Sequence, residues 1–178
     1  MTPLKVIAAS LAGLLLIPVL VIGAVAGGFG NTTGAVDGDV IAAVLGDPHI
    51  RFTPAARADV KSGSIDARIL EVLLLLAQDH ELAPVGPLIT GHTYFVKGTT
   101  RVSNHASGRA VDIIGVDGGP VSPTNGAARA VVEEALTLPA PLAPDEVGGP
   151  WIVQAGARLS FTNADHQDHI HIGYDHEA

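Results

Sequence analysis

The sequence predicts an α+β domain, with a small antiparallel sheet and flanking helices, preceded by one N-terminal transmembrane helix. Three observations support this fold class. A long uncharged apolar run lies close to the N-terminus, and apolar residues at helical spacing follow it. Beyond Pro84 the apolar residues occur in short runs separated by Gly- and Pro-containing turns, which is typical of strands. Helices grouped first and strands later favour an α+β domain with a small antiparallel sheet.

The apolar run extends from Val6 to Phe29 and is long enough to cross a bilayer. Lys5 precedes it, and Asp37 and Asp39 follow it, so we expect a cytoplasmic N-terminus and an extracytoplasmic domain. The alternative is a cleaved signal peptide, because Ala24-Val25-Ala26 resembles a cleavage site; the domain would then be secreted. Residues 1–30 are therefore a membrane anchor or signal segment, 31–38 a linker, and 39–178 the folded domain.

The first half of the domain is expected to be helical. Ser64 or Asp66 is a candidate cap for the longest helix, and Thr53 caps a shorter helix that has Pro54 in its first turn. The expected helices are Val40–Leu45, Pro54–Lys61 and Ile65–His80.

The second half is expected to hold the sheet and one more helix. The helix spans Thr124–Leu136 and opens at Ser122 or Thr124, and Leu138–Pro150 is expected to be irregular. A polar loop spans His92–Asn104, and a turn at Asp117-Gly118-Gly119-Pro120 ends one strand. The expected strands are Val85–Thr90, Arg109–Val116, Trp151–Gln154 and His169–Tyr174.

Composition restricts the function classes. The formal charge is −8 and the chain has no run of Lys or Arg, which argues against nucleic acid as a partner. Cysteine is absent, so any metal must be held by His and carboxylate side chains. The chain has eight histidines, and four of them crowd the C-terminal end: His166, His169, His171 and His176.

Two segments carry the candidate site. His105 and Asp112 lie seven positions apart with Gly108 between them, so a loop histidine and a strand aspartate can each offer one ligand atom. In His169-Ile170-His171 the two histidines face the same side of a strand. Two histidines and one carboxylate leave a fourth position open, as in catalytic zinc sites.

The run from Ser103 to Asp112 matches every fixed position of S-x-H-x-x-G-x-A-x-D. This motif resembles that of zinc D-Ala-D-Ala carboxypeptidases and dipeptidases, L,D-endopeptidases, lysostaphin-type endopeptidases and the hedgehog domain. The later Asp168-His169-Ile170-His171 is similar to the second motif of the same superfamily. The resemblance covers residues 82–174 and implies Zn²⁺ as the cofactor, with His105, Asp112 and His171 as its ligands.

The resemblance also suggests catalytic residues. Asp168 matches the general base of the group and is the favoured candidate, with His169 and Asp165 as alternatives. The group's peptidases usually carry an Arg before the first ligand, where this chain has Thr90-Gly91-His92. Either His92 takes that role, or Arg101 or Lys97 reaches in from the loop, or the site is not catalytic.

Three functions remain open on the sequence. The leading prediction is a membrane-anchored, extracytoplasmic zinc metallopeptidase acting on peptidoglycan stem peptides or cross-links. Its partners would be a cell-wall peptide substrate and the membrane. The second is a catalytically silent, zinc-containing binding module of a cell-envelope complex. The third is a metal-free structural domain of such a complex, for which the motif match would be accidental.

Overall fold

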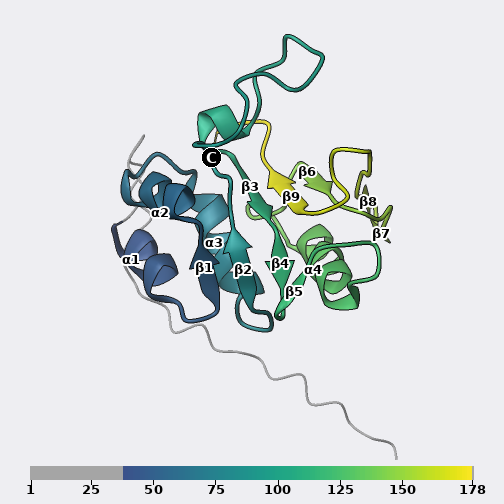
Figure 1. Cartoon of the computed structure of the whole chain (residues 1–178), viewed down its shortest axis with the longest axis horizontal. Helices are drawn as coiled ribbons and strands as arrows, with labels where there is room; N and C mark the ends of the chain where they lie inside the picture. The colour runs from purple at the N-terminus through teal and green to yellow at the C-terminus, as the bar shows by residue number, and fades with distance from the viewer. Residues whose placement is uncertain (1–37, 178) are drawn as a thin grey trace, which may run out of the picture. The chain divides into compact units, whose positions relative to one another are not determined.

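The computed structural model describes residues 38–177, and this part of the chain is an α+β domain as predicted (Figure 1). Its helices are α1 (Gly38–Gly46), α2 (Pro54–Lys61), α3 (Ala67–Leu76), the short 3₁₀ helix η1 (His105–Ser107) and α4 (Gly126–Thr137). The predicted transmembrane or signal segment and most of the linker lie outside the described residues. Within residues 38–177, no helix is long and apolar enough to span a membrane.

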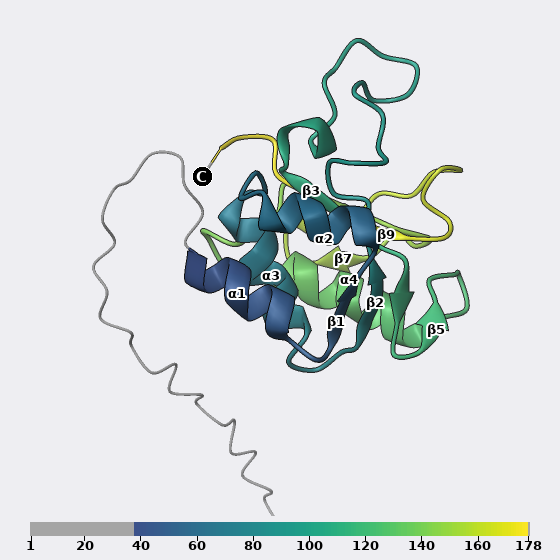
Figure 2. The ribbon, with the colours of Figure 1, turned by 60° about the vertical axis from the view of Figure 1, so that its left-hand side comes forward.

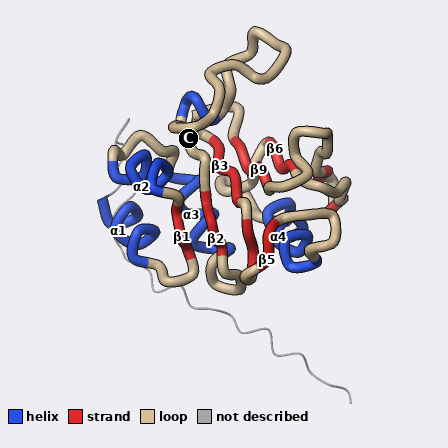
Figure 3. The backbone as a smooth tube through the Cα atoms, viewed as in Figure 1, coloured by secondary structure: helices blue, strands red, loops and turns tan. Residues whose placement is uncertain are grey.

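The described residues form one seven-stranded sheet and a separate two-stranded one. The main sheet has the order β5-β4-β2-β3-β9-β6, with β1 pairing parallel to β2 and all other pairs antiparallel. Figure 3 shows these strands side by side. Their bounds are β1 (Ile50–Phe52), β2 (Leu82–Val85), β3 (Ala110–Ile113), β4 (Gly115–Val116), β5 (Gly119–Pro120), β6 (Glu146–Gly148) and β9 (Ile170–Gly173). The small sheet pairs β7 (Gln154–Ala155) with β8 (Arg158–Leu159).

The core lies between the sheet and the helices. α4 contacts β4, β6 and β9, and α3 contacts both α1 and α4. Alternate residues of the two central strands point into this core, and all are fully buried: Val111, Ile113, Ile170 and Ile172. The residues between them therefore face the opposite side of the sheet, where polar side chains gather.

Helix starts follow the expected capping chemistry. The Thr53 hydroxyl accepts a hydrogen bond from the Ala56 amide, with Pro54 in the first turn of α2. Asp66, one of the two expected caps, begins α3 by accepting from the Arg68 amide. The prediction for α4 named the wrong cap, because the Asn125 side chain accepts from the Ala128 amide in place of Ser122 or Thr124.

Two of the predicted strands are misplaced. Val85–Thr90 is not a strand, because β2 ends at Val85 and the chain then turns at Gly86 and Pro87, which has no amide hydrogen for a strand ladder. Trp151–Gln154 is also wrong, since only Gln154 belongs to a strand. In contrast, the stretch expected to be irregular, Leu138–Pro150, contains strand β6.

The other predicted elements are confirmed in outline. The predicted strand Arg109–Val116 forms as β3 and β4, which are separated at Ile114, and His169–Tyr174 contains β9. The predicted loop His92–Asn104 is irregular apart from one bridge between Phe95 and Val102. It rises in teal at the top of Figure 1, and Figure 2 shows it standing clear of the sheet.

Candidate metal centre

Strands β3 and β9 bring Asp112 and His171 together. The two residues are direct partners in the antiparallel register, and both lie on the face opposite the core. Their side chains are nearly inaccessible to solvent, with residue exposures of 4% and 7%. The His171 Nδ1 lies 3.1 Å from the Asp112 Oδ1. Strand pairing alone therefore places two of the three predicted ligands in contact.

The third predicted ligand, His105, comes from the loop before β3. Gly108 ends the 3₁₀ turn at φ +70°, and an added Cβ there would lie 2.1 Å from the Ser64 carbonyl oxygen. Only glycine fits this close approach without a backbone shift. On the other side of the turn, the Ser103 hydroxyl accepts a hydrogen bond from the His105 amide at 3.3 Å. The fixed Ser and Gly of the motif thus shape the turn that carries His105.

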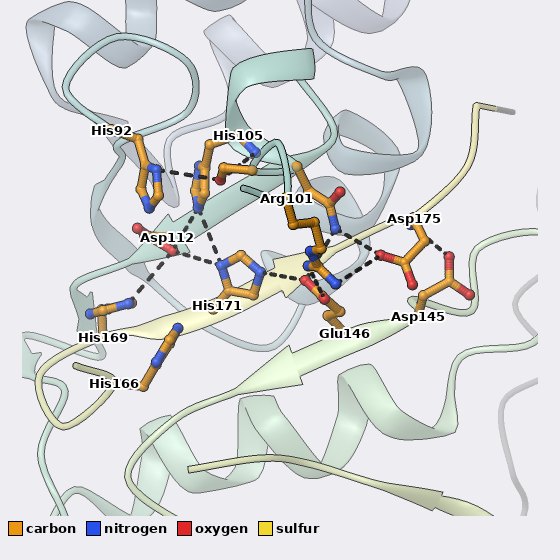
Figure 4. Close-up of polar contacts among 12 residues, drawn as sticks. His92, Arg101, His105, Asp112, Asp145, Glu146, His166, His169, His171 and Asp175 are labelled. Carbon is orange, nitrogen blue, oxygen red and sulfur yellow. Dashed lines mark hydrogen bonds and ion pairs between the residues drawn. The ribbon is translucent and has the colours of Figure 1, made fainter. Parts of the chain in front are cut away.

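The predicted ligand atoms of these residues converge (Figure 4). The His105 Nε2 lies 3.2 Å from both the Asp112 Oδ1 and the His171 Nδ1, and the latter two atoms are 3.1 Å apart. Three ligands at zinc's usual bond length of about 2.0–2.1 Å in a tetrahedral shell lie roughly 3.3 Å apart. The donor set and its spacing therefore fit a small divalent ion such as zinc.

The remaining ring nitrogens are already occupied. The His105 Nδ1 lies 2.6 Å from the Leu88 carbonyl oxygen and donates its hydrogen there, and the Nε2 of the same ring faces Asp112. The His171 Nε2 lies 3.3 Å from the Glu146 Oε2. The Nδ1 on the other side of the ring therefore faces the Asp112 Oδ1 and the His105 Nε2. Hydrogen bonds of this kind orient metal-binding histidines and fix their tautomers.

The carboxylates of Asp112 and Glu146 in this cluster need a positive charge to balance them. Burial would raise the pKa of Asp112, but its hydrogen bonds with His105 and His171 hold that pKa well below its usual range. Burial would also lower the pKa of His171, but its contacts with Asp112 and Glu146 raise it to about 9. In the metal-free protein a proton on His171 therefore supplies the positive charge, and a bound cation would replace that proton.

His92 lies beside this cluster and forms part of a second possible ligand set. Its ring stacks on that of His105, with 4.0 Å between centroids and 13° between planes. One ligand atom from each of His92, His105 and Asp112 lies within 4.8 Å of the others, so this group could hold a metal ion. The two rings are nearly parallel, so their lone pairs do not converge on one point unless His92 tilts.

The predicted bases occupy different positions. The His169 Nε2 lies 3.7 Å from the Asp112 Oδ1, and its side chain is 19% exposed. The Asp168 side chain is 87% exposed and contacts the His169 Nδ1 at 2.9 Å. Asp168 thus faces away from the ligand atoms, as expected for its odd spacing from His171, and reaches the cluster only through His169. The base remains a prediction, and this geometry favours His169 with Asp168 as its orienting partner.

The other candidates for base or cation are held in ion pairs. The Lys97 Nζ donates a hydrogen bond to the Asp165 Oδ1 at 2.6 Å, and this contact lowers the pKa of Asp165. Arg101 bonds Glu146 at 2.5 Å and approaches Asp175 at 4.0 Å. Neither cation points unpaired at the ligand cluster, so neither is free to take the role that the resemblance gives to the Arg of the peptidases.

Sequence reasoning missed three residues of the site. Glu146 lies in the Pro-rich stretch, where no pattern indicated a strand; its contacts with His171 and then Arg101 lower its pKa to about 2. His166 has its ring 4.9 Å from that of His169 and 5.6 Å from that of His171. Asp59 in α2 accepts hydrogen bonds from the Ile89 and Thr90 amides and so anchors the segment before His92.

A cleft of about 800 Å³ opens onto this cluster. It is lined by His105, Asp112 and His171, by residues of the protruding loop, and by Phe161. Gly148 makes room for Phe161, since a Cβ at Gly148 would lie 2.5 Å from the ring. The candidate ligands are therefore accessible from a concave surface large enough for a peptide.

No family model, curated protein or solved structure matches this chain. The membership of the zinc peptidase and hedgehog superfamily that the two motifs imply therefore stays a prediction.

Proposed function

We propose that this protein is an extracytoplasmic zinc metallopeptidase that acts on peptidoglycan stem peptides or cross-links, anchored through its N-terminal segment. The observation that carries the proposal is the convergence of the His105 Nε2, Asp112 Oδ1 and His171 Nδ1 atoms at 3.1–3.2 Å. Both histidines are held by contacts of one ring nitrogen, with the other ring nitrogen facing that point. Three protein ligands at the base of an open cleft are typical of catalytic zinc sites.

Zinc in this position would supply Lewis acidity, which polarises a carbonyl group and makes water acidic near neutral pH. His169 is placed to accept a proton at its Nε2, on the cleft side of Asp112. Its Nδ1 hydrogen is donated to Asp168, which fixes the tautomer and stabilises the imidazolium that forms. The His169 ring can then return the proton to the leaving amine.

Weak stabilisation of the oxyanion limits this reaction. Burial lowers the pKa of His92, so the ring in the place of the usual Arg is neutral at pH 7. Lys97 and Arg101 line the cleft, but each is paired with a carboxylate. A missing oxyanion donor reduces turnover by about 100- to 1,000-fold in other hydrolases. We therefore propose slow hydrolysis.

The test is hydrolysis of purified stem peptides and muropeptides by the zinc-loaded full chain. Chelation should abolish cleavage and zinc should restore it, whereas His169→Ala should lose cleavage and keep its zinc. Leu159→Ala is a control for nonspecific loss of folding, because Leu159 is 61% exposed and does not line the cleft. If the wild-type protein with full zinc occupancy leaves every peptide uncut, the peptidase proposal fails.

A second candidate, a silent zinc-containing binding module, is favoured by His92. If its ring tilts, His92 can join His105 and Asp112 as a ligand and close the fourth position, which would leave no room for substrate. X-ray absorption spectroscopy of the zinc-loaded protein distinguishes the two candidates. A loss of one imidazole from the zinc shell in His92→Ala would support the binding module, and an unchanged shell would support the peptidase.

A further inference from the structure

One peptide group links the candidate metal centre to a buried carboxylate of α2. Its carbonyl oxygen, on Leu88, accepts the hydrogen of the His105 Nδ1 at 2.6 Å. Its amide, on Ile89, donates a hydrogen bond to the Asp59 Oδ2 at 3.0 Å. The Asp59 carboxylate, this peptide group and the ring of His105 therefore form one continuous chain of two hydrogen bonds.

The carboxylate at the far end of this chain is buried without a cation. Asp59 is 9% exposed, and its other hydrogen bonds come from the Thr90 amide at 2.8 Å and the Thr90 hydroxyl at 2.7 Å. None of the ion pairs found within residues 38–177 includes Asp59. A buried charge without an opposite charge beside it is costly, whereas a neutral acceptor would take the same hydrogen bonds at a lower cost. The anchoring of Thr90 therefore does not explain why the residue is charged.

The peptide group can transmit the effect of that charge to His105. A peptide group is planar and delocalised, so a negative charge at its N–H increases the electron density on its carbonyl oxygen. The Leu88 carbonyl is then a stronger acceptor for the His105 Nδ1 hydrogen, and a ring that donates more strongly at Nδ1 is a better metal ligand at Nε2. The distance of 2.6 Å between the two atoms is shorter than the usual range of about 2.7–3.2 Å for N–H···O bonds, which agrees with a strong acceptor.

The position of this segment does not depend on Asp59 alone. The Gly86 amide donates to the Asp112 carbonyl at 2.7 Å, and the Asp112 amide donates to the Pro87 carbonyl at 3.1 Å. Strand β3 thus holds the two residues just before Leu88. Loss of the charge at Asp59, with its hydrogen bonds kept, should therefore leave the Leu88 carbonyl in place.

We propose that Asp59 is a positioning residue for the metal, whose charge acts through the Leu88–Ile89 peptide group and strengthens His105 as a zinc ligand. This proposal rests on the metal centre of the proposed function, and it does not depend on peptide hydrolysis. Asp59 lies outside residues 82–174, the part of the chain that the motif resemblance covers, so neither motif indicates it.

Asp59→Asn separates the charge from the hydrogen bonds. The amide oxygen of Asn can accept from both backbone amides, and its NH₂ group can donate to the Thr90 hydroxyl, so each contact keeps a partner. Chelator competition on the purified full chain should show zinc binding about tenfold weaker than in the wild type. If Asp59→Asn binds zinc as the wild type does and only Asp59→Ala binds it more weakly, Asp59 merely anchors the segment and the proposal is overturned.

Asp117→Asn is the matched control. It removes the same charge from a carboxylate that also accepts a backbone hydrogen bond, from the Glu81 amide, and Asp117 does not line the cleft. This variant should bind zinc as the wild type does. An equal loss of zinc affinity in both variants would make the effect one of net charge and would overturn the proposal.

A second measurement needs no variant. When zinc binds the His105 Nε2, its pull on the ring should strengthen both hydrogen bonds of the chain, so the Ile89 amide proton should shift downfield in NMR spectra of the wild type. The Thr90 amide is the internal control, because it donates to the same Asp59 oxygen but belongs to a different peptide group. An Ile89 shift no larger than that of Thr90 would overturn the proposal.

These readouts separate the role of Asp59 from the proposed function. A wild type that binds zinc and shows the Ile89 shift, but cuts no peptide, would support the role of Asp59 and refute the peptidase function. A wild type that cuts peptide, with equal zinc affinity in Asp59→Asn, would refute only the role of Asp59. A wild type that binds no zinc would overturn both.

Discussion

Replacement of Gly108 by alanine tests how the motif glycine supports the site. An alanine at φ +70° costs about 1–2 kcal/mol because of its left-handed backbone. The new Cβ would also lie 2.1 Å from the Ser64 carbonyl oxygen, so backbone must move, which adds about 1–3 kcal/mol. We expect Gly108→Ala to lower the free energy of unfolding by about 2–5 kcal/mol, measured by urea denaturation of the full chain.

Gly118→Ala is the matched control. Gly118 has φ +76° and nothing within 4 Å of an added Cβ, so only the backbone penalty of about 1–2 kcal/mol applies. Gly108→Ala should also weaken zinc binding, because the displaced turn carries His105, whereas Gly118→Ala should bind zinc as the wild type does. Equal loss of stability in both variants, with unchanged zinc affinity, would refute this account of the turn.

Three further predictions concern the groups around the ligands. Glu146→Gln should weaken zinc binding by about 10- to 100-fold in a competition assay, since the carboxylate orients His171; unchanged affinity would contradict that role. Asp168→Asn should keep full zinc content and lose part of its peptide turnover, whereas loss of zinc would make Asp168 a ligand. His171 has a pKa raised from 6.5 to about 9, so its stabilisation of the metal-free fold is complete below pH 6.5 and is lost as the pH rises through 9. The melting temperature of the metal-free protein should fall over that window, and a flat profile would contradict the assignment.

Local signals predicted the elements that local chemistry determines. Thr53 and Pro54 specify the start of α2 through a side-chain cap and a fixed φ, and the structure has that start. The turn at Asp117 and Gly118 could be predicted from the sequence because glycine tolerates the positive φ that the turn requires. Alternation from His169 into β9 correctly placed His169 and His171 on one side, and the structure brings both next to Asp112.

The features that depend on distant contacts could not be predicted. β6 lies within a Pro-rich stretch and is a strand because it pairs with β9, so no local period indicated Glu146. Val85–Thr90 has an apolar pattern that favours a strand, yet the amides of Ile89 and Thr90 bond Asp59 of α2 in place of a strand partner. His166 gave no signal, because its approach to His169 depends on how the preceding loop folds.

The most direct test of the central claim is the zinc content of the purified full chain by elemental analysis. The convergence of His105, Asp112 and His171 predicts about one zinc per chain in the wild type and in His92→Ala, and almost none in His105→Ala or His171→Ala. Circular dichroism would confirm that the variants stay folded. A folded His171→Ala variant that still holds about one zinc per chain would contradict the ligand assignment and with it the proposed function.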